Sequence, residues 1–546
     1  METKCRPSFE AMESIGQRKA IDMTHHFDRR RFLKAAGVVA AVHLAPRQLR
    51  AATTPTKQPH ILIIHTDEHR IECLGAYGNA DVKTPHIDRL AADGVRYDNS
   101  FCPFPVCTPS RYSLLCGQYV HEHRGWNNHS TLAPAIATFP KMLRTAGYRT
   151  KAVGKMHFTP TYLDVGFSEM ALAEQNGPGR WDDDYHRYLR AHDLVDRNDL
   201  EDQLVREYRT HAPQEYWDTC GALVSNLPEK HHSTTWVADR AVEALQDWTA
   251  DNPHLLMVGF IKPHHPFDPP APWDRLYDPD KLTLLPGWTP DCLDRDLKYS
   301  RGYFPHDKLS EPTLRRVLAF YYATITQIDH HVGRMIEILK RKGLYDNTLI
   351  VFTSDHGDYM GFHHMLLKGN YMYDPVVKVP LIVKWPGNRA AGTVSRRLVN
   401  NIDLAPTLCR ETGCTAADSM HGHALQSGDG HELIFAEARG GREVMARSQT
   451  RKLILSTGNG VNLYFDLEKD PYELTNLYGT AEYRGEIEAM AAKLTAWRCQ
   501  EAKPKPHLDQ DARQIDQPNV PPHDLSHRED IQRYYREKMR ALQNPT

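Results

Sequence analysis

One cysteine stands in a pattern that could support covalent chemistry. Cys107 lies two residues before Pro109 and four before Arg111, in the segment Cys-Thr-Pro-Ser-Arg. Most free cysteines are small buried hydrophobic side chains, so a cysteine alone does not indicate catalysis. Cys102 has no proline or arginine at these offsets and is predicted to be structural. The segment makes Cys107 the candidate nucleophile.

Carboxylates and a histidine follow two apolar runs elsewhere in the chain. Asp67 comes after residues 60–65, and Asp355 with His356 comes after residues 348–353. Carboxylate oxygens are hard ligands that suit a divalent cation. The hard oxygens favour calcium, and because the imidazole of His356 is softer, manganese is the alternative. The sequence predicts one divalent cation near these strand ends.

The elements that must position these residues follow from the apolar pattern. Further polar clusters follow two other predicted strands: Lys155 and His157 come after residues 148–153, and His264 comes after residues 255–261. The pattern also predicts helices over residues 139–147 and 313–342. Four strand ends that carry polar clusters indicate one doubly wound α/β sheet with a single site along its edge.

The rest of the chain divides by composition. Residues 164–216 and 268–308 are polar or proline-rich and are interpreted as insertions over the site. Short strands split by glycine-rich turns over residues 432–467 predict a smaller subdomain with an antiparallel sheet. The predicted limits are a signal peptide over 1–52, a catalytic domain over 53–390, the subdomain over 391–500, and a proline-rich tail with a surface helix over 501–546.

The cysteine segment, followed by Leu-Leu-Cys-Gly at 114–117, resembles the maturation motif of the type I sulfatases of the alkaline phosphatase-like superfamily. The resemblance extends from about residue 59 to 497. It is carried by Gly-Lys-Met-His at 154–157, Pro-His-His-Pro at 263–266, Asp-His-Gly-Asp at 355–358, Val-Pro-Leu-Ile-Val at 379–383, Asp-Leu-Ala-Pro-Thr-Leu at 403–408, and the segment 465–473. In this order the set is highly specific.

The resemblance implies that a maturation enzyme oxidises Cys107 to formylglycine. In the hydrated aldehyde, one hydroxyl attacks sulfur and the other later collapses to expel sulfate, which divides one hard step into two. The family's metal positions correspond to Asp67, Asp355, His356 and the modified Cys107. Glu68 stands where many relatives have a second aspartate and is included as a ligand.

The resemblance also assigns roles around the sulfate group. It implies that Arg111 holds the formylglycine, while Lys155 and Lys368 supply charge to the nonbridging oxygens. His157 and His264 match the family's sulfate-contacting pair, and His264 is the candidate to protonate the leaving oxygen. 

Two further positions near the predicted site leave questions open. Asn128 resembles a polar residue that approaches the diol, although the adjacent Asn127 leaves the register open. Phe362-His363-His364 stands where many relatives have Glu-His-Gly, so substrate orientation is expected to differ.

The N-terminus resembles a twin-arginine export signal. Arg29, Arg30 and Arg31 precede Phe-Leu-Lys and an apolar run over 35–45, which is too short to cross a bilayer as a helix. We therefore expect a periplasmic or secreted protein that is carried by the twin-arginine translocase and has no transmembrane segment.

The overall composition excludes some classes of partner. The chain has 546 residues, with 67 Lys and Arg against 69 Asp and Glu, and a formal net charge of −2. No global field points to nucleic acid or to a membrane surface, so local cations and a metal must capture an anionic substrate. Ten cysteines at irregular spacings form no zinc pattern and no dense disulfide framework.

These observations favour a hydrolase of sulfate monoesters. The nearest alternative is a phosphonate monoester or phosphodiester hydrolase of the same fold, and the second is a non-catalytic glycan-binding relative with an unmodified Cys107. The predicted insertions and the residues after them contain aromatic side chains that either stack on sugar faces or fill a core: Trp181, Tyr185, Trp217 and Trp236. With export, these favour a sulfated carbohydrate over a small sulfated molecule.

Overall fold

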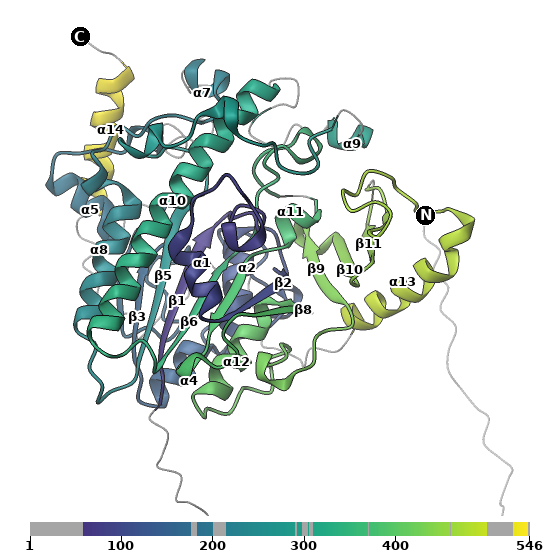
Figure 1. The fold of residues 1–546 in the computed structure, drawn as a ribbon, viewed down its shortest axis with the longest axis horizontal. Helices are drawn as coiled ribbons and strands as arrows, with labels where there is room; N and C mark the ends of the chain where they lie inside the picture. The colour runs from purple at the N-terminus through teal and green to yellow at the C-terminus, as the bar shows by residue number, and fades with distance from the viewer. Residues whose placement is uncertain are drawn as a thin grey trace, which may run out of the picture. The chain divides into compact units, whose positions relative to one another are not determined.

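Four strands whose ends carry the predicted site are neighbours in one sheet (Figure 1). In the computed structural model they run parallel, in this order across the sheet: β3 (Arg149–Gly154), β5 (His254–Pro263), β1 (His60–Asp67) and β6 (Thr348–Ser354). β1, β5 and β6 are buried along their whole length, as parallel strands between two helical layers must be. Their carboxyl ends therefore meet at one edge of the sheet, as the sequence predicted.

Four further strands make the sheet mixed, in the order β4-β3-β5-β1-β6-β7-β2-β8. These strands are β2 (Val95–Phe101), β4 (Glu169–Leu172), β7 (Leu381–Lys384) and β8 (Thr393–Asn400). β7 is antiparallel to both neighbours. β4 lies in the segment predicted as an insertion, because four residues are too few to form a recognisable apolar run. β8 joins the larger sheet although it lies past residue 390.

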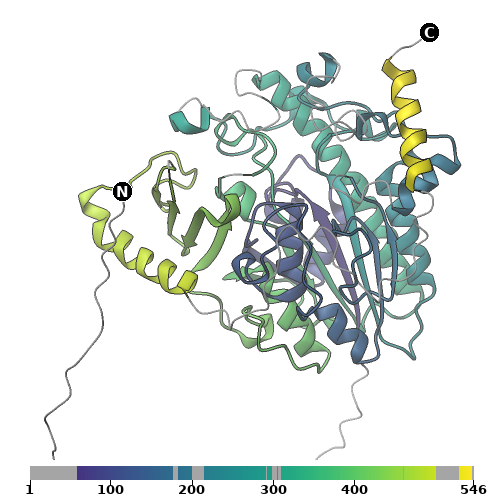
Figure 2. The ribbon, with the colours of Figure 1, turned by 180° about the vertical axis from the view of Figure 1, so that it is seen from behind.

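The alternation of side chains along β1 builds two cores. Leu62 and Ile64 pack in a cluster with one helical layer, and Ile61 and Ile63 pack with the other. The first layer contains α1 (Pro85–Ala92), α8 (Ser233–Gln246) and α10 (Glu311–Arg341). The second, which faces the viewer in Figure 2, contains α2 (Cys107–Cys116), α4 (Phe139–Thr145) and α12 (Leu404–Glu411).

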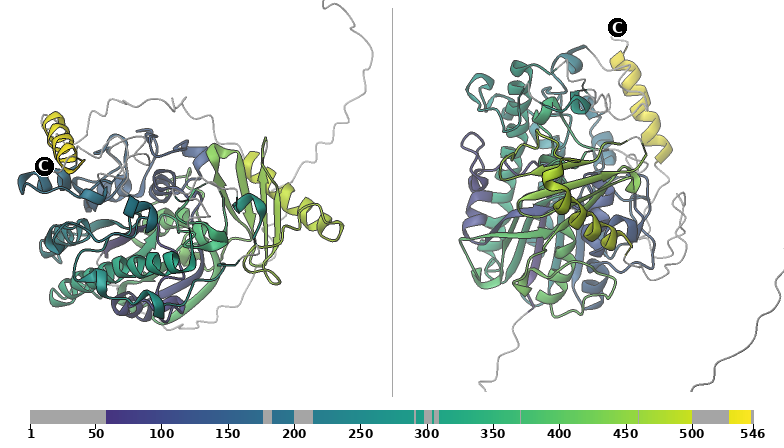
Figure 3. Two further views of the ribbon diagram at one scale, coloured as in Figure 1. Left: turned by 90° about the horizontal axis from the view of Figure 1, so that it is seen from above. Right: turned by 90° about the vertical axis from the view of Figure 1, so that its right-hand side faces the viewer.

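A smaller antiparallel sheet follows, as predicted (Figure 3). Its strands are β9 (Ile434–Ala438), β10 (Glu443–Arg447), β11 (Arg451–Ser456) and β12 (Leu463–Asp466). One face packs against α13 (Arg484–Cys499) through Leu494 and Trp497.

The structure describes residues 58–175, 183–199, 214–289, 292–297, 304, 309–369, 371–458, 460–499 and 528–543. The predicted signal peptide and Trp181 lie outside these ranges, as does most of the proline-rich tail. The remaining α-helices described are α3 (Val120–His123), α5 (Asp184–Ala191), α7 (Gln214–Asp218), α9 (Asp294–Leu297), α11 (Asp374–Val377) and α14 (Arg528–Gln543). Within the described ranges, no helix has both the length and the apolar character that crossing a membrane requires.

Candidate active site

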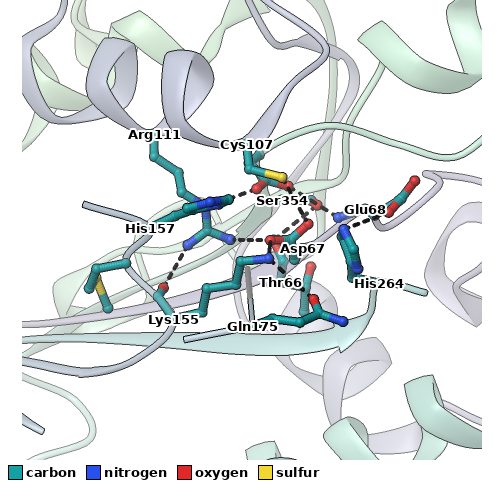
Figure 4. A network of polar contacts seen from close by, with 12 residues as sticks. Thr66, Asp67, Glu68, Cys107, Arg111, Lys155, His157, Gln175, His264 and Ser354 are labelled. Atoms are coloured by element: carbon teal, nitrogen blue, oxygen red, sulfur yellow. Dashed lines mark hydrogen bonds and ion pairs between the residues drawn. The ribbon is translucent and has the colours of Figure 1, made fainter. Parts of the chain in front are cut away.

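Cys107 begins α2 above the carboxyl edge of the sheet (Figure 4). Its Sγ lies 3.6 Å from Asp67 Oδ1 and 3.4 Å from His356 Nε2. The side chain is fully buried, and burial together with the Asp67 charge raises the pKa of the thiol to about 12. An unmodified Cys107 is therefore a protonated thiol at neutral pH and a poor nucleophile.

Arg111 lies one helical turn after Cys107 and binds two carboxylates. Its Nη2 is 3.0 Å from Asp67 Oδ2 and its Nε is 2.9 Å from Asp355 Oδ2. Its Nη1 donates to the backbone carbonyl of Lys155 at 2.6 Å. The guanidinium thus ties the ends of β1, β6 and β3 together beneath Cys107.

The predicted metal ligands lie close together. Asp67, Cys107, Asp355 and His356 each offer a ligand atom, and these atoms all lie within 4.8 Å of one another. His356 Nδ1 contacts the carbonyl of Gly357 at 2.9 Å, which leaves Nε2 on the side of the carboxylates. Two carboxylates with one imidazole are donors that suit a divalent cation, and the predicted formylglycine would offer an oxygen in place of the Cys107 sulfur.

Glu68 faces both the metal cluster and the cationic side of the site. Its Oε2 accepts a hydrogen bond from Lys368 Nζ at 2.7 Å and lies 3.4 Å from His264 Nε2. Its Oε1 is buried and has no hydrogen-bond partner among the residues the structure describes. Burial raises the pKa of this carboxyl, against the charge of Lys368. Because buried oxygens are nearly always paired, the orphaned Oε1 fits a bound cation.

Two lysines complete the charge balance. Lys155 is fully buried, and its Nζ lies 2.7 Å from Asp67 Oδ2. Lys368 is 15% exposed, and although burial lowers its pKa, the carboxylates of Glu68 and Asp67 raise it well above the usual range. With Arg111, these two cations balance the carboxylates of Asp67, Glu68 and Asp355.

The two predicted sulfate-contacting histidines differ in their partners. Both ring nitrogens of His157 are buried and unpaired within the described ranges. His264 Nδ1 contacts the carbonyl of His265, which leaves Nε2 toward Glu68. Burial and neighbouring lysines hold the pKa of both imidazoles well below its usual range. The unpaired nitrogens of His157 are free to meet a substrate oxygen.

Asn128, rather than Asn127, contacts the segment that carries Cys107. Asn128 Oδ1 accepts a hydrogen bond from the backbone N–H of Thr108 at 3.1 Å, in the first turn of α2. The exposed Asn127 instead accepts from the N–H of His129 at 2.8 Å.

The segment that departs from the family pattern makes its contacts elsewhere. His363 Nδ1 lies 2.8 Å from Asp296 Oδ2, and its Nε2 lies 2.8 Å from the carbonyl of Tyr472. His364 Nε2 lies 2.9 Å from the carbonyl of Thr289. None of these partners belongs to the predicted site.

Two of the aromatic residues named from the sequence are core residues. Tyr185 and Trp236 are buried against each other in the cluster on the α8 side of the sheet. Trp217 is partly buried and packs on Tyr216 and Phe304 beside His265.

Sequence reasoning missed two residues that touch the site. Glu174 accepts the backbone N–H of His157 at 2.9 Å, and Gln175 Oε1 accepts from Lys155 Nζ at 3.4 Å. Both follow β4, which lies parallel to β3 at the edge of the sheet. The available signal was a pair of polar residues after the apolar Leu172 and Ala173.

The chain is similar to known sulfatases along most of its length. A family model described as Sulfatase matches residues 59–414. An arylsulfatase of Clostridium perfringens is 30% identical, covering 79% of this chain and 92% of the relative. An N-acetylglucosamine-6-O-sulfatase of Bacteroides thetaiotaomicron is 26% identical, covering 81% and 87%. The crystal structure of a phosphonate monoester hydrolase of Agrobacterium radiobacter matches with a TM-score of 0.69 and 26% identity, covering 81% and 96%.

Proposed function

Since the chain belongs to the sulfatase family of the alkaline phosphatase-like superfamily and is a sulfuric ester hydrolase, we propose that it cleaves a carbohydrate sulfate monoester with a formylglycine made from Cys107. The observation that carries the proposal is the position of Cys107, whose Sγ contacts both Asp67 and His356. The buried, protonated thiol gives no thiolate, which favours an oxidised residue as the nucleophile.

The groups that the proposal adds to the chain fit the residues around them. Formylglycine supplies, as its hydrate, a hydroxyl nucleophile and a second hydroxyl whose collapse releases sulfate. A divalent cation, with calcium favoured and manganese the alternative, supplies Lewis acidity to the reacting oxygens. Asp67, Asp355 and His356 would hold it together with the modified Cys107. Glu68, which groups with Asp67 and His264, is the further predicted ligand.

The chain's own residues bind and orient the sulfate group. The ammonium group of Lys155 pairs with Asp67 and that of Lys368 with Glu68, and there they would stabilise charge on the nonbridging oxygens. His157 offers two unpaired ring nitrogens to the substrate. Asn128 fixes the first turn of α2, and Arg111 holds Asp67 and Asp355 in place beneath the nucleophile.

Two measurements test this function. Mass spectrometry of the peptide that contains Cys107 should show formylglycine when the protein is produced with a maturation enzyme. Kinetics on a panel of sulfated glycans and small sulfate esters should show the highest kcat/KM on a glycan. An unmodified cysteine would instead favour a non-catalytic glycan-binding protein.

A second candidate is a phosphonate monoester or phosphodiester hydrolase. The similarity to the phosphonate monoester hydrolase favours it, as does the histidine in the proposed metal shell. Both reactions need a metal, lysine and histidine around a tetrahedral anion. Paired kinetics on a sulfate ester and a phosphodiester with the same leaving group distinguish them, and a higher kcat/KM on the phosphodiester would reverse the assignment.

His264 is proposed to protonate the leaving oxygen after the negative charge of the bound sulfate ester has favoured its charged imidazolium form, and this role predicts a dependence on leaving group. For poor leaving groups, His264→Ala should lower the rate by roughly 10²–10⁴-fold. An activated aryl sulfate needs little protonation and should be affected much less. Rates of the variant across aryl sulfates of graded leaving-group acidity measure this. A uniform loss would assign His264 to charge stabilisation and pass the general-acid role to His157 or Lys368.

Export by the twin-arginine translocase predicts that Cys107 is modified before the protein leaves the cytoplasm. That translocase carries folded proteins, whereas the maturation enzyme must reach Cys107 in an unfolded chain, so modification should precede export. With Arg29 and Arg30 replaced by lysine, formylglycine-containing protein should accumulate in the cytoplasm. Cell fractionation and mass spectrometry test this, and an unmodified cysteine in the retained pool would contradict the order.

A further inference from the structure

We infer that Gln175 is a positioning residue that aligns Lys155 with His264 across the sulfate pocket. The inference rests on the proposed function, because it assumes that these two side chains meet the sulfate ester. Gln175 is 0% exposed and lies in the polar network of Figure 4.

The carboxamide of Gln175 bridges two sides of the site. Its Oε1 accepts a hydrogen bond from Lys155 Nζ at 3.4 Å. Its Nε2 donates to the backbone carbonyl of His265 at 2.6 Å and to Asp199 Oδ1 at 3.1 Å. One side chain therefore connects the loop after β3 to the loop after β5.

The backbone carbonyl of His265 connects Gln175 to His264, the proposed general acid. The same oxygen accepts from Gln175 Nε2 and contacts His264 Nδ1. With Nδ1 held by this contact, the imidazole Nε2 faces Glu68 at 3.4 Å. A displaced His265 carbonyl would release the His264 ring, so Gln175 acts on His264 through this oxygen.

Buried contacts hold the bridge in place. Asp199 lies in a cluster of buried acids in which the fully buried Lys262 forms an ion pair with Asp268. Lys262 Nζ also donates to the carbonyl of Pro266 at 2.7 Å, which anchors the His264 loop from its other end. Gln175 thus has a firm support on the side away from the substrate.

The neighbouring residue supports the same pocket. Glu174 accepts the backbone N–H groups of Met156 at 3.1 Å and His157 at 2.9 Å, and its own N–H is held by Asp183. Glu174 therefore fixes the loop that carries Lys155 and His157, and Gln175 fixes the Lys155 ammonium itself.

The Lys155 ammonium has two partners, Asp67 and Gln175, so loss of Gln175 should change where the ammonium lies. Its Nζ lies 2.7 Å from Asp67 Oδ2, so without Gln175 Oε1 the ammonium has only the carboxylate to hold it. Its charge would then be drawn toward Asp67 and away from the sulfate oxygens. Both substrate and inorganic sulfate should bind more weakly, since both use this ammonium.

Gln175→Met tests the inference, because methionine has a similar length and no strong hydrogen-bonding group. We expect KM and the inhibition constant of inorganic sulfate each to rise about 10-fold, and kcat to fall about 10-fold or more. Gln175→Glu is a second variant: it keeps an acceptor for Lys155 but loses the donor to His265, so kcat should fall more than sulfate affinity. Gln327→Met is the matched control, because Gln327 of α10 is also fully buried but donates its hydrogen bond to Thr235 of α8.

Combination with Lys155→Met separates positioning from general stability. If Gln175 acts through Lys155, the double variant should bind sulfate almost as strongly as Lys155→Met alone. Calorimetry measures both affinities. Three results would overturn the inference. The losses of sulfate affinity in the two single variants could add up in the double variant. Gln175→Met could keep the wild-type kcat, KM and sulfate inhibition constant, or Gln327→Met could show changes as large as those of Gln175→Met. If the wild-type protein cleaves no sulfate ester, the proposed function fails instead, and sulfate binding still reports on Gln175.

Discussion

Alanine in place of Cys107 should abolish turnover, lowering kcat by about 10⁶-fold, which is the scale seen when a covalent nucleophile is removed. The buried site offers no substitute, since the nearest atoms belong to Asp67 and His356, which the proposal assigns to the cation. Removing one buried sulfur from a well-packed helix start should cost only about 1 kcal/mol of folding free energy. Rates on an aryl sulfate and a thermal unfolding scan measure the two effects.

Cys102→Ala is the matched control for this prediction. Cys102 is as fully buried as Cys107, and its Sγ donates to the carbonyl of Val376 at 3.7 Å, away from the cluster. We expect it to lose a similar amount of stability and no activity. Cys107→Ser should also be inactive unless the maturation enzyme accepts serine. Near-wild-type activity in purified Cys107→Ala would refute the proposed nucleophile.

The sequence predicted the strand ends well because long buried strands leave a clear pattern. The runs before Asp67 and Asp355 each contain four consecutive apolar residues, as is typical of a strand buried between two helical layers. Since parallel strands end at one edge, proximity of Asp67, Lys155, His264 and Asp355 followed from the topology alone. The four-stranded antiparallel sheet was equally visible as short strands between turns.

The pattern of apolar and polar residues could not predict which side chains that are distant in the sequence contact one another in the fold. The edge strand β4 has only four residues and starts with an exposed glutamate, so the polar pair Glu174 and Gln175 after it was too weak a signal to predict contact with Lys155. The sequence likewise did not predict that Tyr185 and Trp236 fill the core, because an aromatic side chain suits both a core and a sugar-binding surface. The contact between Glu68 and Lys368 depends on a left-handed backbone at Glu68, with φ of 61°, which no local signal announced.

Removal of the divalent cation should lower kcat by about 10³-fold or more, because the carboxylates of Asp67, Glu68 and Asp355 and their cationic partners are arranged around its proposed position. Prolonged chelation followed by assay tests this, and readdition of calcium or manganese should restore activity and identify the ion. Full activity in a protein shown by elemental analysis to be free of metal would refute the metal site.

A single-atom change at Asp355 tests the same site without a chelator. Asp355 Oδ1 accepts the N–H groups of Glu68 and His356, and Oδ2 pairs with Arg111. Asparagine keeps the volume of the side chain but removes the charge that attracts the cation. It also puts an amide group, which has only one acceptor oxygen, where the N–H groups of Glu68 and His356 converge. We therefore expect the metal affinity to fall by about 100-fold or more. Asp329→Asn is the control, because Asp329 is also a buried aspartate that accepts two backbone N–H groups, at the start of α1. Loss of metal from Asp355→Asn but not from Asp329→Asn would show that the cation depends on this carboxylate, whereas equal occupancy in both would place the cation elsewhere.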